Sequence, residues 1–532
     1  MKKLTILAAA IFLLASCKSV TSKKADTFVY CSEGSPTIFN PQLVTDGASF
    51  NATTETIYDK LVNFERGTTN VIPELAQAWE ISKDGLEYTF TLRKGVKFHT
   101  TDYFKPTREF NAEDVLFSVN RQLDKKNPYH MVNGGSYEYF NSMDMGNLIK
   151  KVEKLDDYTV KFTLSKREAP FLANLAMGFM SILSKEYADK LLAAKTPELL
   201  DTQPIGTGPF IYQKYIKDST IRYAANPEYF KGAADIKKLV FAITPDASVR
   251  FQKLKAGECQ FVSHPNPVDI DLMKQDKSIK VVEAPGLNVG YLAMNVENPK
   301  LKNKLVRQAI NYALNKSSYI KAIYLGSAEV AKNPIPPTMW SYNDEVKDYD
   351  YNPEKAKELL AQSGQKNLSF ELWTLPVSRP YNPNGKKMGE LIQADLAKVG
   401  IKVKLVTYDW PTYLEKSKNG EHELLQLGWT GDNGDPDNFL NVLLSCSGTK
   451  AGSNRSRWCN KSFDKLIDEA KETSDKQKRI QYYMQAQEVF KEYAPWVTLA
   501  HAKTFRAMRD NVAGYKISPF GTDAFYGVKI KE

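Results

Sequence analysis

Three aspartates lie close together in the stretch GWTGDNGDPDNF, residues 428–439. Asp432, Asp435 and Asp437 are interleaved with glycine, asparagine and proline, and Trp429 precedes them. Carboxylates at this spacing are able to bind a metal ion, act as a catalytic pair, stabilise a turn or bind a cationic ligand. The rest of the chain has to distinguish between these four kinds of chemistry.

The spacing of the aspartates disfavours both a calcium loop and a catalytic pair. An EF-hand-like loop needs glycine at its sixth position and glutamate at its twelfth. Counted from Asp432, those positions hold Asp437 and Leu443. Two carboxylates about 5–10 Å apart would suit a glycosidase, but no histidine, nucleophile or phosphate-binding motif accompanies them. We predict that the chain is not an enzyme and holds neither a metal nor a cofactor.

The start of the chain has the pattern of a bacterial export signal. Two lysines precede an apolar run of about 11 residues, which is shorter than the roughly 20 that span a bilayer. The motif LASC, residues 14–17, resembles a lipobox, in which Cys17 becomes the lipid-modified first residue of the mature protein. We therefore predict a lipoprotein signal over 1–17, a tether over 18–26 and a periplasmic protein anchored by lipid to a bacterial membrane.

The cysteines agree with export. Besides Cys17, four cysteines form an even set, as is usual where disulfides persist. Cys446 and Cys459 enclose a loop rich in glycine, serine and charge that a local disulfide would hold together. This leaves Cys31 to pair with Cys259. Zinc is a poor alternative, because the sequence contains no CxxC or HxxxH spacing.

Composition is that of a globular protein rather than a nucleic-acid-binding one. The 532 residues are enough for about three domains or subdomains. The net charge of +10 is mild for this length and the basic residues are scattered, so we expect no nucleic-acid partner.

Hydrophobic periodicity predicts a mixed α/β fold. Strand and helix alternate most regularly after about residue 286, which is typical of an α/β lobe, whereas earlier residues are richer in hairpins. The predicted elements are strands over 27–33 and 158–165, a hairpin over 86–99, helices over 110–123, 304–324 and 352–364, and helix–strand units over 386–408 and 474–501.

Eight blocks in the same order resemble one family, the dipeptide- and oligopeptide-binding proteins that deliver substrates to ABC importers. The blocks are PELAQAWEISKDGLEYTFTLRKGVKFH (73–99), FNAEDVLFS (110–118), IGTGPF (205–210), GLNVGYLAMN (286–295), VRQAINYALNK (306–316), IPPTMW (335–340), RPYNPN (379–384) and GWTGDNGDPDNFL (428–440). The last two look like the dipeptide-binding branch, and the four cysteines lie where that branch has two disulfides. The resemblance extends from residue 27 to 527.

The resemblance implies a two-lobed periplasmic-binding-protein fold, with a hinge and with lobes that close on the ligand. Lobe I is expected to combine residues 27–55, 200–285 and 504–532, and an extra subdomain of that lobe is expected over 56–199. Lobe II is expected over 286–503.

The same resemblance implies how a ligand is held. A short peptide is a zwitterion, so a buried site needs one anion and one cation to avoid unpaired buried charges. By resemblance, Asp432 binds the ligand ammonium and Arg379 binds the carboxylate, for which a planar guanidinium is well suited. Asp435 and Asp437 are expected to be turn and capping residues. The other implied ligand-binding residues are Trp429, Tyr381, Gly431, Gly34, Ser35 and Tyr137.

The predicted function is that of a monomeric substrate-binding lipoprotein that captures dipeptides and delivers them to ABC permease subunits in the membrane. Two alternatives on the same fold bind glutathione or haem. Glutathione carries the same amino and carboxylate groups, and haem would need an axial ligand, although none of the five histidines lies in a recognisable motif. A surface adhesin is a further alternative, which no small ligand would stabilise.

Overall fold

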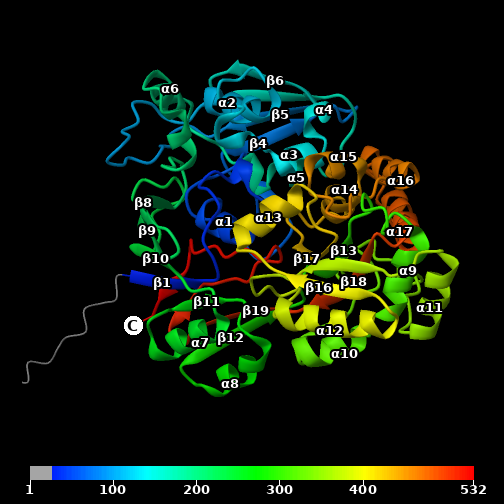
Figure 1. Ribbon diagram of the computed structural model, residues 1–532. Helices are drawn as coiled ribbons and strands as arrows, with labels where there is room; N and C mark the ends of the chain where they lie inside the picture. The colour runs from blue at the N-terminus through cyan, green and yellow to red at the C-terminus, as the bar shows by residue number, and fades with distance from the viewer. Residues whose placement is uncertain (1–26, 532) are drawn as a thin grey trace, which may run out of the picture.

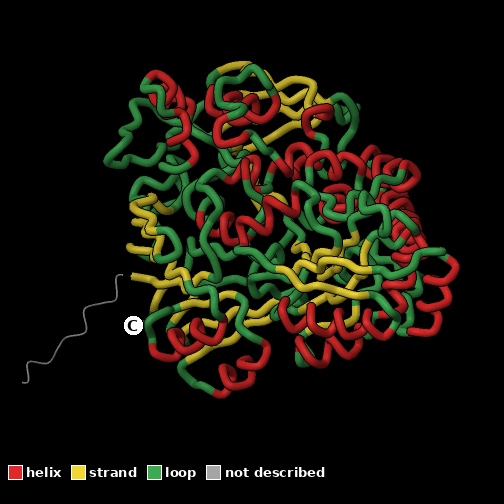
Figure 2. The backbone as a smooth tube through the Cα atoms, in the orientation of Figure 1, coloured by secondary structure: helices red, strands yellow, loops and turns green. Residues whose placement is uncertain are grey.

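The computed structural model describes residues 27–531 (Figure 1). The predicted signal, Cys17 and the tether lie outside the described residues. Two large sheets and a smaller one form the framework, and helices lie around and between them (Figure 2). Among residues 27–531, no helix is both long and apolar enough to cross a bilayer.

The first large sheet has seven strands, in the order β12-β19-β11-β1-β10-β9-β8. Its strands are β1 (Thr27–Ser32), β8 (Phe210–Ile216), β9 (Thr220–Ala225), β10 (Lys238–Ile243), β11 (Phe261–Ser263), β12 (Ile279–Ala284) and β19 (Thr504–Arg509). The strand predicted over 27–33 is the central β1, which runs parallel to β10 and β11. Helices α7 (Ala247–Ala256) and α8 (Ile270–Gln275) lie beside this sheet (Figure 1).

The second large sheet has six strands, in the order β14-β18-β13-β17-β15-β16. Its strands are β13 (Asn288–Met294), β14 (Ala328–Val330), β15 (Ser369–Trp373), β16 (Lys402–Val406), β17 (Leu424–Thr430) and β18 (Trp496–Ala502). The helices of this part are α9 (Lys304–Ala313), α10 (Lys316–Tyr319), α11 (Pro353–Gln362), α12 (Gly385–Lys398), α13 (Trp410–Lys418), α14 (Asp437–Leu444), α15 (Cys446–Ala451), α16 (Lys461–Glu472) and α17 (Lys476–Tyr493). All seven residues of β13 are buried, as expected for a central strand.

Two short connections join the large sheets. Residues 285–287 lead from β12 to β13, and Lys503 alone separates β18 from β19. The side chain of Asn288 ties the two connections together, because it donates to the carbonyl of Ala502 at 2.8 Å and accepts from the N–H of Ala502 at 2.9 Å. Gly286 is required here, since a Cβ would lie 2.0 Å from the Ala502 oxygen.

The smaller sheet is antiparallel, with strands β4 (Ala76–Ile81), β5 (Glu87–Leu92), β7 (Thr159–Leu164) and β6 (Ile149–Asp156) in that order. Its helices and those around it are α1 (Gly47–Ala52), α2 (Ala112–Leu123), α3 (Glu138–Ser142), α4 (Met145–Leu148), α5 (Phe171–Leu175) and α6 (Lys185–Ala193). The short pairs β2 (Val62–Phe64) with β3 (Val71–Pro73), and β20 (Val512–Ala513) with β21 (Lys529–Ile530), complete the set. The helix predicted over 110–123 is confirmed as α2, and Asn111 and Asp114 form a capping box at its start.

The hairpin predicted over residues 86–99 is wrong. β5 pairs with the preceding strand β4, and the turn lies at Ser82–Gly85. Asp84 Oδ1 accepts from the Ser82 hydroxyl at 2.6 Å, and Gly85 has a φ of +71°, as an Asp-Gly turn allows. Residues 96–99 instead bond to distant loops, since the N–H of His99 donates to the carbonyl of Gly206 at 2.9 Å.

The single helix predicted over residues 304–324 is also wrong. α9 stops at Ala313, Leu314 is extended, and a new helix, α10, begins after Asn315. Asn315 accepts from the N–H of Ser318 at 3.2 Å and its own N–H donates to Asp395 at 2.9 Å. A cap residue bonded to a neighbouring helix interrupts a periodicity that is otherwise continuous. The elements predicted over 352–364, 386–408 and 474–501 are confirmed as α11, α12 with β16, and α17 with β18.

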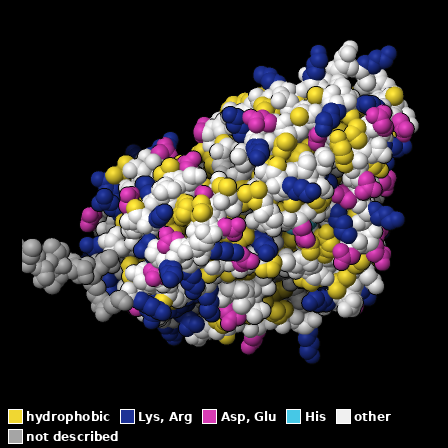
Figure 3. Space-filling model, turned by 90° about the horizontal axis from the view of Figure 1, so that it is seen from below, with side chains coloured by type: hydrophobic (Ala, Val, Ile, Leu, Met, Phe, Trp, Pro, Cys, Tyr) yellow, Lys and Arg dark blue, Asp and Glu magenta, His cyan; other side chains and the backbone are white. Residues whose placement is uncertain are grey.

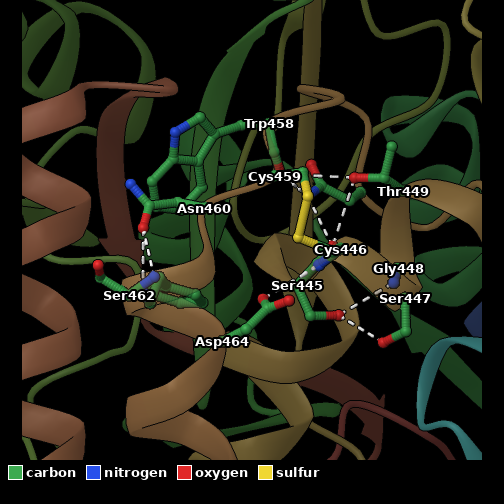
Figure 4. Close-up of a disulfide and its surroundings, with 12 residues drawn as sticks. Ser445, Cys446, Ser447, Gly448, Thr449, Trp458, Cys459, Asn460, Ser462 and Asp464 are labelled. Atoms are coloured by element: carbon green, nitrogen blue, oxygen red, sulfur yellow. Dashed lines mark hydrogen bonds between the residues drawn. A yellow bond between two sulfur atoms is a disulfide. The ribbon is translucent and has the colours of Figure 1, made fainter.

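Both predicted disulfides are confirmed. Cys31 in β1 bonds to Cys259 before β11, and Cys446 bonds to Cys459. The second disulfide joins the start of α15 to the segment before α16 (Figure 4). There the N–H of Cys446 donates to Asp464 Oδ1 at 3.1 Å.

Charges are mixed on the surface. In the face seen from below, acidic and basic side chains are interspersed with hydrophobic ones over most of the area, and Lys and Arg gather at one end (Figure 3).

We expect replacement of Cys31 and Cys259 by alanine to lower the free energy of unfolding by about 2–5 kcal/mol, because this disulfide closes a long loop. The sequence separation is 228 for this pair and 13 for Cys446–Cys459, so the second double alanine variant is the matched control and should lose less. Urea denaturation monitored by circular dichroism measures the free energy of unfolding of both double variants. An equal or larger loss in the control would contradict the loop-closure argument.

Candidate functional site

The stretch that contains the three aspartates follows the central part of the six-stranded sheet. β17 ends at Thr430, a turn follows, and α14 begins at Asp437. Asn438 organises this turn, because its Oδ1 accepts from the N–H of Asp432 at 2.8 Å and from Trp429 Nε1 at 3.0 Å. One buried amide oxygen therefore sets the positions of Asp432 and Trp429 together.

Asp432 is half-buried, and its carboxylate is bonded to a neutral group. The hydroxyl of Tyr139, from α3, donates to its Oδ2. Burial raises the pKa of Asp432 to about 7, while the hydrogen bonds from Tyr139 and Asn438 act in the opposite direction. Within residues 27–531 no Lys, Arg or His forms an ion pair with this carboxylate. A cationic ligand group would supply the missing charge.

Asp435 and Asp437 have protein partners instead. Arg479 Nη2 donates to both oxygens of Asp435, at 2.9 and 2.8 Å. Asp435 Oδ1 accepts from the N–H of Asp437 at 3.1 Å, which fixes the start of α14. Burial raises the pKa of Asp437 to about 6, and the charge of nearby Lys471 opposes this effect. These two aspartates therefore stabilise the turn and the helix.

Arg379 lies in a loop between β15 and α12, where its main chain pairs with that of Asn382. The residue is buried, at 7% exposure. Nη1 donates to Glu33 Oε1 at 2.8 Å, and the guanidinium lies 5.1 Å from the centre of the Trp410 ring. The cation is thus held by one anion and one aromatic face.

Glu33 lines the site, although it is not among the ligand-binding residues predicted from the sequence. Gly34 and Ser35 beside it are. It follows β1 and is 2% exposed. Burial alone would raise its pKa, but the positive charges of Arg379 and Arg250 hold it well below the usual range. The sequence feature that could have indicated Glu33 is a single glutamate directly after a predicted buried strand. Its Arg partner is 346 residues away in sequence, so only the fold pairs them.

Arg379 and Asp432 line one cavity of about 90 Å³ between the two large sheets. Trp429 and Tyr381 line it too, and so do Glu33, Asp46, His264 and Arg455. Four of the eight predicted ligand-binding residues are thus brought together around one space that carries both signs of charge.

Glycines in the sheet let the Arg379 loop pack close to it. A Cβ on Gly428 would lie 2.2 Å from the Tyr381 ring, and one on Gly290 would lie 2.2 Å from the Tyr381 carbonyl oxygen. The Tyr324 hydroxyl donates to the same carbonyl at 2.6 Å. These contacts position Tyr381 and, two residues before it, Arg379.

The other four predicted residues lie outside the lining of this cavity. Gly431 faces the core, where a Cβ would lie 2.7 Å from the Phe439 ring. The Ser35 hydroxyl donates to Asp218 at 2.6 Å, and space is open beside Gly34.

Tyr137 is the fourth of these residues. Its hydroxyl donates to the carbonyl of His130 at 2.9 Å, inside the small-sheet region. Tyr139, two residues later, reaches Asp432 instead. The prediction therefore identified the correct loop but the wrong tyrosine. α3 begins at Glu138, between Tyr137 and Tyr139, and directs the two side chains to different places.

Among residues 27–531, no cluster of three or more His, Cys, Asp or Glu side chains is placed to hold a metal ion.

The geometry is that of a binding protein whose cleft lies between two lobes, and comparison with known proteins agrees. Residues 70–451 match the family "Bacterial extracellular solute-binding proteins, family 5 Middle". The chain therefore belongs to this family, and both the predicted two-lobed α/β fold and the family resemblance are confirmed.

Individual relatives cover nearly the whole chain. The chain is 56% identical over 511 residues to the dipeptide-binding protein of Escherichia coli, covering 96% of each. It is 48% identical to heme-binding protein A of Haemophilus influenzae, over 100% of this chain and 99% of that one. A dipeptide-binding protein from a Pseudoalteromonas species, solved with Met-Leu, has a TM-score of 0.93 and 41% identity, covering 95% of this chain and 100% of its own.

We expect Gly428→Ala to lower the free energy of unfolding by about 1–3 kcal/mol, because Tyr381 has to move to make room for the methyl group. Gly34→Ala is the matched control, since nothing lies within 4 Å of its added Cβ, and it should stay within about 0.5 kcal/mol of the wild type. Urea denaturation checks both variants. Equal stability of the two would show that the Tyr381 contact is not tight.

Proposed function

We propose that this chain is the substrate-binding lipoprotein of an ABC importer, which captures dipeptides and delivers them to a membrane permease. The observation that carries the proposal is the single cavity lined by Arg379 and Asp432. The names of the Escherichia coli and Pseudoalteromonas relatives support the ligand class.

In this proposal, the two charged side chains bind opposite ends of the ligand. A guanidinium has five N–H donors, and the bond to Glu33 occupies one of them, so others are available to the ligand carboxylate. The ligand ammonium binds Asp432. Trp429 and Tyr381 cover the ligand without a selective charge, which leaves its side chains free to vary.

Closure of the lobes follows from the lining of the cavity, which includes Glu33 and Asp46 of lobe I beside Arg379 and Asp432 of lobe II. A ligand that touches residues of both lobes stabilises the closed form by as much as it prefers that form. The predicted boundaries stand in this proposal, with 286–503 as lobe II, 56–199 as the subdomain, and residues 285–287 and Lys503 as the hinge. The protein acts as a monomer, anchored in the periplasm through lipid on Cys17.

Haem is a second candidate ligand. One relative is named a heme-binding protein, and His264, alone among the five histidines, lines the cavity. Burial keeps the pKa of His264 well below its usual value, so the imidazole is neutral and its nitrogen is able to bind iron. A thermal-shift panel of dipeptides, tripeptides, reduced and oxidised glutathione and haemin separates these ligands. Stabilisation by haemin alone would overturn the dipeptide assignment, and no stabilisation by any of them would favour an adhesin.

We expect Asp432→Ala to weaken binding of Ala-Ala by about 3–5 kcal/mol, a loss of roughly a hundred- to several thousand-fold, because the ligand ammonium would be buried without a partner. Isothermal titration calorimetry measures the dissociation constant. Asp344→Ala, an exposed aspartate with 89% of its side chain accessible, is the control and should bind as the wild type does. Unchanged affinity in Asp432→Ala would remove Asp432 from the site.

We expect the affinity for Ala-Ala to fall as the pH decreases below about 7. Burial raises the pKa of free Asp432 to about 7, and a bound ammonium lowers it, so binding at lower pH has to release a proton. Above about pH 8 the peptide amine loses its own proton, which limits binding on the alkaline side. Titrations from pH 5 to 9 measure this profile. Asp432→Asn should lose the acidic slope, and persistence of that slope would assign it to another group.

A further inference from the structure

A second and larger cavity adjoins the dipeptide site beyond Asp432. Its volume is about 320 Å³. Phe50, Asp432, Phe520 and Thr522 line both cavities, so the two spaces meet at the proposed ammonium end of the ligand. A cavity beside Arg379 measures only about 20 Å³. The free space around the ligand is therefore concentrated at one end.

Two of the carboxylates in the large cavity are already neutralised or hydrogen-bonded. Glu74 forms an ion pair with Lys231 at 2.5 Å. Asp59 accepts from the hydroxyls of Thr207 at 2.7 Å and Tyr229 at 3.0 Å. Glu74 and Asp59 are part of the cavity wall. Their carboxylates already have partners within the protein.

Glu55 differs from them. Its Oε1 accepts a long hydrogen bond of 3.4 Å from the Thr522 hydroxyl. Lys60 attracts it electrostatically, but within the described part of the chain Glu55 forms no ion pair. The neighbouring Thr54 is 6% exposed, lines the same cavity, and its hydroxyl has no hydrogen-bond partner among the described residues. Two adjacent polar groups in this wall are thus available to a ligand.

We propose that Glu55, with the Thr54 hydroxyl, binds a second cationic group of the ligand in the cavity beyond Asp432. This inference rests on the proposed function and specifies its substrates. A carboxylate and a hydroxyl oxygen are both acceptors, which is what an ammonium or a guanidinium requires. The cation has two possible sources: the side chain of a Lys or Arg at the first ligand position, or the amino terminus of a peptide longer than two residues.

The Lys source is tested by titration calorimetry of Ala-Ala, Lys-Ala and norleucyl-Ala, a neutral analogue of similar shape. We expect Lys-Ala to bind the wild type about tenfold tighter than norleucyl-Ala, and Glu55→Gln to abolish that difference while leaving Ala-Ala unchanged. Glu65→Gln, an exposed glutamate at the rim of the same cavity, is the matched control and should keep the preference.

Ala-Ala-Ala tests the second source. If its amino terminus reaches Glu55, Glu55→Gln should weaken its binding about tenfold and Asp432→Asn should weaken it less than it weakens Ala-Ala. The inference is overturned if Glu55→Gln leaves both Lys-Ala and Ala-Ala-Ala unchanged, or weakens all ligands including Ala-Ala equally. Failure of wild-type protein to bind Ala-Ala would instead overturn the proposed function.

Discussion

The buried ion pair between Glu33 and Arg379 is the constraint on which the site depends. Glu33 follows β1 of the seven-stranded sheet, and Arg379 follows β15 of the six-stranded sheet, so the pair bridges the two halves of the fold. Either charge alone would be costly to bury, and both side chains are almost inaccessible, at 8% for Arg379 and 2% for Glu33. The pair keeps the guanidinium charged and oriented over Trp410, in the wall of the cavity.

The two ends of the site are built differently. Arg379 has an anion of its own, whereas the Asp432 carboxylate accepts from the neutral hydroxyl of Tyr139 and the Asp432 N–H donates to Asn438 Oδ1. In the proposed function, the cationic end is therefore preorganised, and the anionic end reaches its full charge when it binds the ligand ammonium. This difference also explains why three aspartates lie close together in residues 428–439. Asp435 pairs with Arg479 to secure the turn, and the turn presents Asp432 without a protein cation.

Much of the fold could be read from local patterns. Some helix and strand boundaries depend only on residues close in sequence, and these boundaries are visible in the sequence. Examples are the cap at Asn111, the start of α11 at Pro353 and the turn at Gly400 before β16. The expectations failed where distant contacts decided the outcome. His99 bonds to the loop around Gly206 rather than to a neighbouring strand, and Asn315 ends α9 by bonding to Asp395.

The sequence by itself determined the mixed α/β class, the disulfide partners and, through resemblance, the two charged residues of the candidate site. Only the tertiary structure decided that Glu33 is the partner of Arg379, that Tyr139 rather than Tyr137 reaches Asp432, and that Gly431 serves core packing. The physical reason is that residue type and spacing encode local conformation and net charge. Which charges become neighbours after burial depends on contacts between segments hundreds of residues apart.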